Sequence, residues 1–176
     1  AYEMLIRDWS SDVCSSDLRL ADLLRYALES TDEHEVTLRQ ELAFLERYLE
    51  IEKTRFGSRL TVRLEVPAET LDALVPNLIL QPLVENAIKH GIERRSKPGL
   101  IELRARCEGD RLRLTLVDNG PGLPAEPGGR KGIGLANTRA RLQELYGESH
   151  TFELRNGSEG GVVVEVIMPL RRAPER

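Results

Sequence analysis

The chain has 176 residues, of which 40% are hydrophobic and 31% charged, a composition that suits one packed domain and excludes disorder throughout. Its 25 basic and 29 acidic side chains are interspersed and give a net charge of -4, which argues against a protein whose whole surface binds nucleic acid. The longest apolar runs fall far below the roughly 18 residues that cross a bilayer, so the sequence predicts no membrane-spanning segment.

Two helices and a strand are predicted in the N-terminal third. Residues 1–18 have neither helical nor strand periodicity and contain a Ser- and Asp-rich run that resembles a translated sequencing adaptor, so we expect an artefactual or disordered leader. Apolar residues at helical spacing predict a short helix over residues 20–28. A longer helix is predicted from Thr37 to Phe56, because Thr37 and Gln40 form a capping-box pattern ahead of a near-heptad row of leucines. Residues 60–66 alternate between apolar and polar, the period of a half-buried strand.

A third helix is predicted to open at Pro76 and to end at Gly91, because Pro is favoured in the first helical turn and Gly just after the last. Pro82 inside this segment predicts a kink or a later start. Residues 100–107 and 112–117 then predict two strands of a hairpin joined by residues 108–111, with Cys107 in the strand core.

The C-terminal part begins with residues 118–131, whose many Gly and Pro residues favour a mobile lid over a regular element. We then predict a helix over residues 135–146 that ends at Gly147, a hairpin of residues 151–155 and 162–169, and a frayed tail from Arg171. Because some strands are joined as hairpins and others across helices, we expect an α/β (α+β) fold, with a mixed sheet and helices packed on one face.

Three segments combine polar side chains with apolar support, and the first is residues 83–91. On a helix, Asn86, Lys89 and His90 share one face, because they are spaced i, i+3 and i+4. An amide oxygen suits Mg²⁺ and a lysine suits phosphate oxygens. A solvated helix face would contain the same three residues, so the pattern alone leaves both interpretations open.

The second segment runs from Asp118 to Gly122 and follows a predicted strand. A carboxylate at a strand end can accept a hydrogen bond from the exocyclic amine of a purine, and glycines let the backbone approach a ligand. Asp-Asn-Gly is also a good tight-turn sequence. The segment by itself is therefore compatible with a nucleotide site and with a simple turn.

The third segment is Lys131-Gly132-Ile133-Gly134-Leu135, which leads into a predicted helix. Backbone N–H groups at such a helix start can bind phosphates. The segment is not a P-loop, which needs Gly-Lys-Ser/Thr, and Asn137 stands where a dinucleotide fingerprint has its third glycine.

Together and in this order, Asn86, Asp118-x-Gly120-x-Gly122 and Gly132-x-Gly134-Leu135 resemble the ATP-binding domain shared by sensor histidine kinases, type II topoisomerases, mismatch-repair ATPases and heat-shock chaperones. The flanking segments are similar to those of LytS-type sensor histidine kinases. The matching stretches are residues 23–26 (LLRY), 41–56 (ELAFLERYLEIEKTRF), 80–92 (LQPLVENAIKHGI), and 132–137 (GIGLAN) with Arg141-Leu142. This resemblance implies a two-layer sandwich of the Bergerat ATP-binding type, with a mixed, mostly antiparallel sheet preceded by two helices.

The resemblance also implies a role for each matched residue. Asn86 would bind the Mg²⁺ of Mg-ATP, Lys89 would meet the phosphates, and Asp118 would recognise the adenine amine. The other matched residues would complete the site, with His90 at the phosphates, Gly120 and Gly122 at the nucleotide floor, Gly132 and Gly134 as hinges of the lid, and Leu135 and Asn137 near the phosphates.

Two departures from the family pattern concern catalysis. Pro82 stands where many relatives have Glu or Asn one helical turn before the metal-binding residue, which leaves Glu85 or Gln81 as the polar candidates for a base. The family's phosphoacceptor histidine has a Pro-His-Phe context, which none of the three histidines shares. His34 and His150 are expected at the surface or in turns. We therefore expect the ATP-binding end of a kinase without its own acceptor histidine.

These inferences divide the chain into a leader (1–18), the end of the dimerisation and connector helices (19–56), an ATP-binding catalytic domain (57–170) and a tail (171–176). The predicted protein is a two-component sensor histidine kinase that phosphorylates a histidine on a dimerisation helix and serves a response regulator. We expect this part in the cytoplasm, and the full-length protein to be a homodimer anchored in the bacterial inner membrane. Two alternatives use the same site: an anti-sigma-type protein serine kinase and a non-catalytic nucleotide-sensing adaptor.

Overall fold

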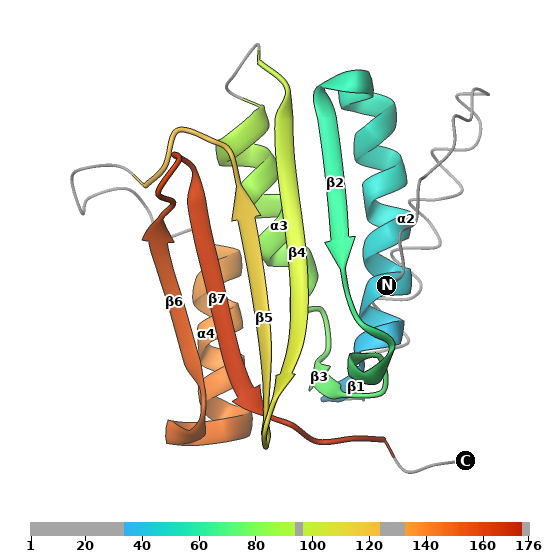
Figure 1. Ribbon diagram of the computed structural model, residues 1–176, viewed down its shortest axis with the longest axis vertical. Coiled ribbons are helices and arrows are strands. Elements are labelled where there is room, and N and C mark those ends of the chain that lie inside the picture. The colour runs from blue at the N-terminus through green and yellow to red at the C-terminus, as the bar shows by residue number, and fades with distance from the viewer. Residues whose placement is uncertain (1–33, 94–96, 124–132, 174–176) are drawn as a thin grey trace.

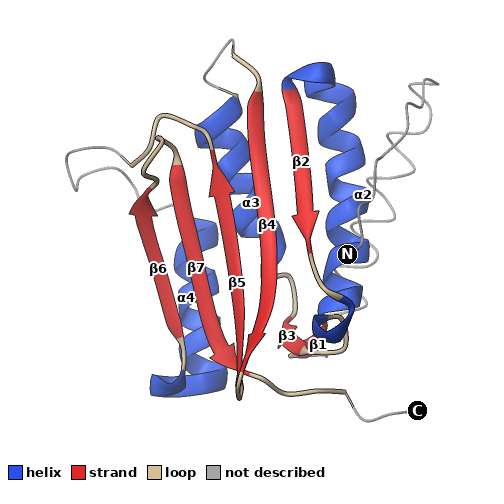
Figure 2. Cartoon of the chain, viewed as in Figure 1, coloured by secondary structure: helices blue, strands red, loops and turns tan. Residues whose placement is uncertain are grey.

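The computed structural model describes residues 34–93, 97–123 and 133–173. A five-stranded sheet forms one layer, and helices α2, α3 and α4 lie behind it in a second layer (Figures 1 and 2). The strand order is β2-β4-β5-β7-β6, and β2 pairs with β4 in parallel whereas the other neighbours are antiparallel. The expected mixed, mostly antiparallel sheet with helices on one face is confirmed.

Helix α2 (Leu38–Phe56) begins as the sequence predicts. Gln40 N donates to Thr37 Oγ1 at 3.3 Å, and Thr37 N donates to Gln40 Oε1 at 2.8 Å, so both bonds of the capping box are present. A short 3₁₀ turn, η2 (Gly57–Arg59), then leads into β2 (Leu60–Glu65), the predicted alternating strand.

Two short strands precede the helices of the site and were not predicted. β1 (Glu35–Thr37) pairs with β3 (Leu74–Pro76), and Glu35 stands opposite Pro76. A 3₁₀ turn, η3 (Ala68–Thr70), lies between β2 and β3. Because Pro76 closes a strand, the prediction that it opens a helix is wrong.

Helix α3 (Leu80–Ala87) starts four residues after Pro76, which confirms the later start predicted from Pro82. It continues through a π-helical turn, η4 (Ile88–Ile92). The prediction that Gly91 ends the helix is therefore wrong, because the helical chain passes through this glycine.

The C-terminal elements follow the predicted order. They are β4 (Gly99–Glu108), β5 (Arg111–Asp118), α4 (Ile133–Tyr146), the 3₁₀ turn η5 (Gly147–Ser149), β6 (Thr151–Asn156) and β7 (Val162–Pro169). The expected fraying is wrong for the start of the tail, because Leu74 N donates to Arg171 O at 2.8 Å and Ala173 N donates to Asp72 O at 3.1 Å. Four predicted segments lie outside the described residues: the leader 1–18, the helix over 20–28, residues 124–131 of the lid with the adjoining Gly132, and the end of the tail.

The core lies between the sheet and the helices. Leu80, Leu83 and Val84 of α3 pack on the inward side chains of β4 and β5 with at most 1% of their surface exposed. Each fully buried side chain of this size contributes roughly 1.5–3 kcal/mol, so α3 is held firmly against the sheet. Cys107 is half-buried beside this core.

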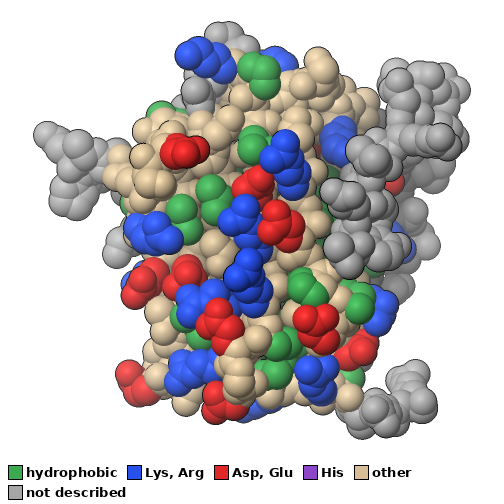
Figure 3. Space-filling model, viewed as in Figure 1, with side chains coloured by type: hydrophobic (Ala, Val, Ile, Leu, Met, Phe, Trp, Pro, Cys, Tyr) green, Lys and Arg blue, Asp and Glu red, His purple; other side chains and the backbone are tan. Residues whose placement is uncertain are grey.

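The opposite face of the sheet carries alternating positive and negative side chains (Figure 3). Arg63 pairs with Glu102 at 3.2 Å, Arg104 pairs with Glu65 at 3.0 Å, and other pairs continue across the sheet. These charges keep this face of the sheet in water. Within the described ranges, no helix has the length and apolarity needed to span a bilayer.

Candidate functional site

Asp118 is the last residue of β5, and only 5% of it is exposed. Its Oδ1 accepts a hydrogen bond from Gly120 N at 2.7 Å, which confirms the tight turn suggested by Asp-Asn-Gly. Asn119 points away from this turn and bonds to β4, because its Oδ1 accepts from Leu100 N at 2.9 Å. The carboxylate is thus held in one orientation at the end of a central strand.

Two glycines let the helical segment touch this strand end. A Cβ at Gly120 would lie 2.6 Å from the Cα of Gly91 and 2.6 Å from Asp118 Oδ1, and a Cβ at Gly91 would lie 3.1 Å from the same oxygen. Distances below 3.0 Å are essentially never seen for real Cβ atoms. No Cβ therefore fits at Gly120, and one at Gly91 would fit only if the Asp118 carboxylate moved by a few tenths of an ångström. We call these two residues the glycine cradle of Asp118.

The turn between β6 and β7 supports the cradle from another side. A Cβ at Gly161 would lie 1.8 Å from the carbonyl oxygen of Asp118, and Gly161 has a positive φ of 73°. Asn156 Oδ1 accepts a hydrogen bond from Leu123 N at 2.7 Å and lies close to Gly122, whose φ is 88°. The segment that carries Asp118, Gly120 and Gly122 is therefore fixed between the helical layer and this turn.

The exposed face of α3 and η4 carries the polar residues predicted for it. Asn86 is half-buried, whereas Glu85, Lys89 and His90 are exposed. Their apolar neighbours Val84, Ala87 and Ile88 are at most 3% exposed. The predicted division of this segment into a core face and a polar face is confirmed.

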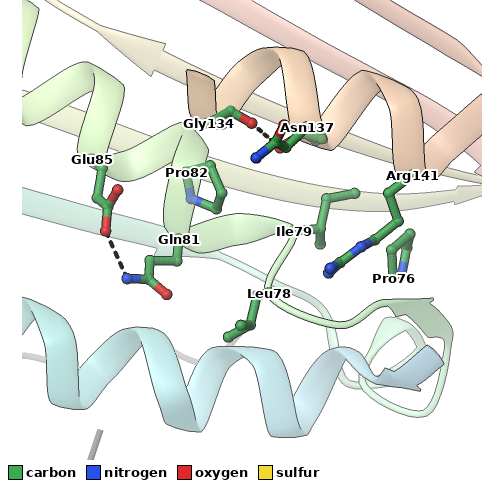
Figure 4. Close-up of a pocket in the computed structure, with 10 residues that line it drawn as sticks. Pro76, Leu78, Ile79, Gln81, Pro82, Glu85, Gly134, Asn137 and Arg141 are labelled. Atoms are coloured by element: carbon green, nitrogen blue, oxygen red, sulfur yellow. Dashed lines mark hydrogen bonds between the residues drawn. The ribbon is translucent and has the colours of Figure 1, made fainter. Parts of the chain in front are cut away.

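A pocket of about 250 Å³ lies between α3 and the start of α4 (Figure 4). Gln81 Nε2 donates to Glu85 Oε1 at 2.6 Å on its wall, so the two polar candidates for a base act as one hydrogen-bonded pair. Pro82 faces Gly134, where a Cβ would lie 3.3 Å from Pro82 Cβ. The pocket is lined by Pro76, Leu78, Ile79, Gln81, Pro82, Glu85, Gly134, Asn137, Thr138 and Arg141.

The predicted site residues of α4 lie in two environments. Asn137 is exposed and Gly134 half-buried, and both line the pocket. Leu135 is half-buried and packs against the core. The structure thus brings Glu85 together with Gly134 and Asn137, and separately brings Asp118 together with Gly120. Asn86, Lys89 and His90 do not line the pocket.

A buried carboxylate that sequence reasoning missed lies at the start of α3. Glu41 of α2 is 1% exposed, and it accepts hydrogen bonds from Leu78 N at 2.5 Å and Leu80 N at 3.1 Å. Burial raises the pKa of this carboxyl, while the backbone N–H groups and the positive charge of Arg141 oppose that rise. A signal was present in the sequence, because Glu41 falls in the apolar stripe between Leu38 and Leu45.

Two family profiles match the chain. The family described as histidine kinase-, DNA gyrase B-, and HSP90-like ATPase matches residues 72–172, and the family described as histidine kinase matches residues 2–60. The chain therefore belongs to the histidine kinase-, DNA gyrase B- and HSP90-like ATPases. This result confirms the ATP-binding fold and the family inferred from the three sequence segments.

Similar proteins include sensor histidine kinases. The chain is 34% identical over 166 residues to sensor histidine kinase YpdA of Escherichia coli, an alignment of 88% of this chain and 28% of that protein. It is 29% identical over 169 residues to sensor protein LytS of Staphylococcus epidermidis, covering 90% of this chain and 28% of that protein. The chain thus spans less than a third of the length of these relatives, and the predicted similarity to LytS-type kinases is confirmed.

The fold also matches solved structures. The histidine kinase domain of the blue-light activated histidine kinase from Erythrobacter litoralis EL346 superimposes with a TM-score of 0.60 at 22% identity. The match covers 92% of this chain and 76% of that domain. At this identity the similarity establishes the common fold.

Proposed function

We propose that this chain is the ATP-binding catalytic module of a two-component sensor histidine kinase, with residues 19–56 as the end of the dimerisation and connector helices and 57–170 as the catalytic domain. The observation that carries the proposal is the buried Asp118 at the end of β5, whose carboxylate is held by the Gly120 N–H and lies beside Gly91. A carboxylate acceptor fixed at a strand end beside two glycines suits recognition of an adenine ring through its exocyclic amine.

Asn86, Lys89 and His90 would hold the phosphate end of the nucleotide. Within the described part of the chain, no three Cys, His, Asp or Glu side chains gather as a metal site. Mg²⁺ therefore fits as an ion shared between the Asn86 amide oxygen, the phosphates and water, because Mg²⁺ commonly keeps several of its waters. When bound, it would neutralise phosphate charge. Gly120 and Gly122 would form the floor, and Gly132, Gly134, Leu135 and Asn137 would border the phosphates.

Catalysis in this site would consist mainly of positioning. As the acceptor imidazole nitrogen bonds to the γ-phosphorus, the bond from that phosphorus to the bridging oxygen breaks and ADP leaves. The imidazole proton would pass to the Glu85 carboxylate, which Gln81 orients through its 2.6 Å hydrogen bond. Glu85, Asn86 and Lys89 are thus the proposed catalytic residues.

Isothermal titration calorimetry with ATP and with inosine triphosphate, each with and without Mg²⁺, tests the site. Wild type should prefer ATP, and Asp118→Asn should lose roughly tenfold or more of its ATP affinity and lose that preference, because inosine lacks the exocyclic amine. Asn86→Ala should abolish the dependence on Mg²⁺. Asp110→Asn, at the exposed turn of the same hairpin, is the matched control and should bind as wild type. A folded wild type that binds neither nucleotide would refute the proposal.

The phosphate acceptor distinguishes the kinase from the two alternatives. Incubation with radiolabelled ATP and the acceptor-histidine segment of a related sensor kinase should give an acid-labile, alkali-stable phosphohistidine. An acid-stable phosphoserine on a protein substrate would favour the serine kinase. Nucleotide binding without any transfer would favour the adaptor.

The partners follow from the proposed phosphorelay. The acceptor histidine would lie on the dimerisation helix of the full-length kinase, which would be a homodimer, and the phosphoryl group would pass to a response regulator. This module would work in the cytoplasm, with the full-length protein anchored in the bacterial inner membrane.

A further inference from the structure

The turn between β3 and α3 is held by two helices that come from different parts of the chain. From α2, Glu41 accepts the N–H groups of Leu78 and Leu80, which lie 37 and 39 residues further along the chain. From α4, the Arg141 guanidinium donates to Asn77 O. Figure 4 shows Arg141 directed towards this turn, with α2 running below it.

The turn has little support of its own. Leu78 has a φ of 56°, the one positive value for a residue other than glycine among the described ranges. Its backbone is therefore held in the left-handed conformation, which is unfavourable for a residue with a β-carbon. Ile79 at the helix start provides no side-chain cap. The first N–H groups of a helix need acceptors, and here the remote Glu41 supplies them.

A buried carboxylate at this position is not explained by its contribution to the stability of the fold. Removing its charge from water is unfavourable, and an apolar side chain of similar size would usually pack there at lower cost. What Glu41 provides, and an apolar side chain cannot, is a pair of acceptors that fix where the backbone of residues 78–80 lies relative to α2.

The position of this turn sets the position of the polar side chains of α3. The α-helix has only eight residues: Gln81 is its second residue, and Glu85 and Asn86 lie less than two turns from its start. Leu78 and Ile79 themselves line the pocket that contains Glu85. A shift of the turn therefore moves this pocket wall and the amide proposed to bind Mg²⁺.

We propose that Glu41 is a positioning residue of the nucleotide site, through which α2 fixes the start of α3 and transmits its own displacement to Asn86. The inference rests on the proposed function. It also joins the two matched families, because α2 lies in the histidine kinase match at 2–60 and α3 lies in the ATPase match at 72–172. Residues preceding the catalytic domain would thereby act on the site without touching the nucleotide.

Three variants of the full chain test the proposal. Glu41→Leu removes both acceptors, Glu41→Gln keeps one acceptor oxygen, and Phe56→Leu weakens packing at the other end of α2, about 22 Å away along the helix axis. The last variant is the control, because Phe56 is buried like Glu41 but lies at the opposite end of α2. All are compared at a temperature where circular dichroism shows each to be folded.

The first measurement is the Kd for Mg-ADP by calorimetry. Glu41→Leu should raise Kd about tenfold and Glu41→Gln by a smaller factor, because buried N–H groups lose their acceptors, whereas Phe56→Leu should stay within twofold of wild type. A wild-type Kd for Glu41→Leu would overturn the proposal. An equal rise in Phe56→Leu would overturn it as well, because the effect would then be general destabilisation.

The second measurement is hydrogen exchange over residues 77–92 without nucleotide, and it does not depend on binding. Exchange should accelerate at residues 78–80 and through 84–87 in the Glu41 variants, in the order Leu then Gln, and not in Phe56→Leu. Unchanged exchange at 84–87 would overturn the positioning role. If wild type fails to bind Mg-ADP while this pattern appears, the proposed function fails and the role of Glu41 in placing α3 stands.

Discussion

Replacing Gly161 by alanine tests whether the backbone contact beneath Asp118 determines the nucleotide site. The new Cβ would lie 1.8 Å from the Asp118 carbonyl oxygen, 2.7 Å from its carbonyl carbon and 3.0 Å from the Cα of Asn119. All three are backbone atoms, which cannot rotate away as a side chain can. The β6–β7 turn and the Asp118 segment must separate by about 1.2 Å to reach the 3.0 Å lower limit.

The expected loss of stability has two parts. Alanine at a φ of 73° costs about 1 kcal/mol, and forced separation of two packed backbones adds roughly 2 kcal/mol. Gly109→Ala is the matched control, because Gly109 has a φ of 61° and nothing within 4 Å of its Cβ position. It should lose about 1 kcal/mol, so the melting temperature should fall roughly three times further in Gly161→Ala.

The binding assay separates the site from the fold. Because the displaced backbone carries Asp118, the affinity of Gly161→Ala for Mg-ATP by calorimetry should fall roughly tenfold or more at a temperature where the variant is folded. Gly109→Ala should bind as wild type. Equal melting temperatures for the two variants would refute the steric argument, and wild-type affinity of a destabilised Gly161→Ala would refute the link between this contact and the nucleotide.

Three further predictions concern stability. Burial raises the pKa of Glu41, so the folded state binds this proton more tightly than the unfolded state does. The free energy of unfolding of wild type, relative to that of Glu41→Gln, should therefore rise as the pH falls from 7 towards the ordinary pKa of 4.5. Urea titrations at several pH values would measure this rise. Tyr146→Phe removes the 2.7 Å hydrogen bond to Glu35 and should cost about 1 kcal/mol in a urea titration, with unchanged nucleotide affinity. Thr37→Ala removes the cap of α2 and should cost about 1 kcal/mol by thermal melting; a loss near zero would mean that β1 alone fixes the helix start.

Most regular elements could be predicted because their signals are local. The capping box of Thr37 and Gln40 and the alternation of β2 each lie within a few residues, and the structure follows them. The pairing of β1 with β3 could not be predicted, because three-residue strands have no period and exist only through partners some 40 residues away. Pro76 fits a helix start and a strand end equally well, and the pairing with Glu35 decides between them.

The chemistry of the candidate site could be predicted more fully than its geometry. Residue type and spacing made Asp118 and Asn86 candidates, and the family resemblance implied their roles. The reason for each glycine, in contrast, lies in a distant segment. Gly91 resembles a helix cap in the sequence, yet in the structure it lies inside the helical segment, where an added Cβ would come within 3.1 Å of Asp118 Oδ1. The sequence pattern of one segment cannot show that a glycine is needed there to make room for a second, distant segment.

Glu41 illustrates the same limit in a charged residue. In the sequence it is one acid among many on α2, and its position in the apolar stripe is the only sign of burial. Its partners are backbone N–H groups, which every residue possesses, so no side chain in the sequence marks them. The short α3 depends on this carboxylate for its first acceptors, because neither Ile79 nor Pro82 can provide a cap. The residue types on the polar face of α3 can therefore be read from its own sequence, whereas the position of that face depends on Glu41 of α2. A change in α2 should for this reason affect the position of Asn86.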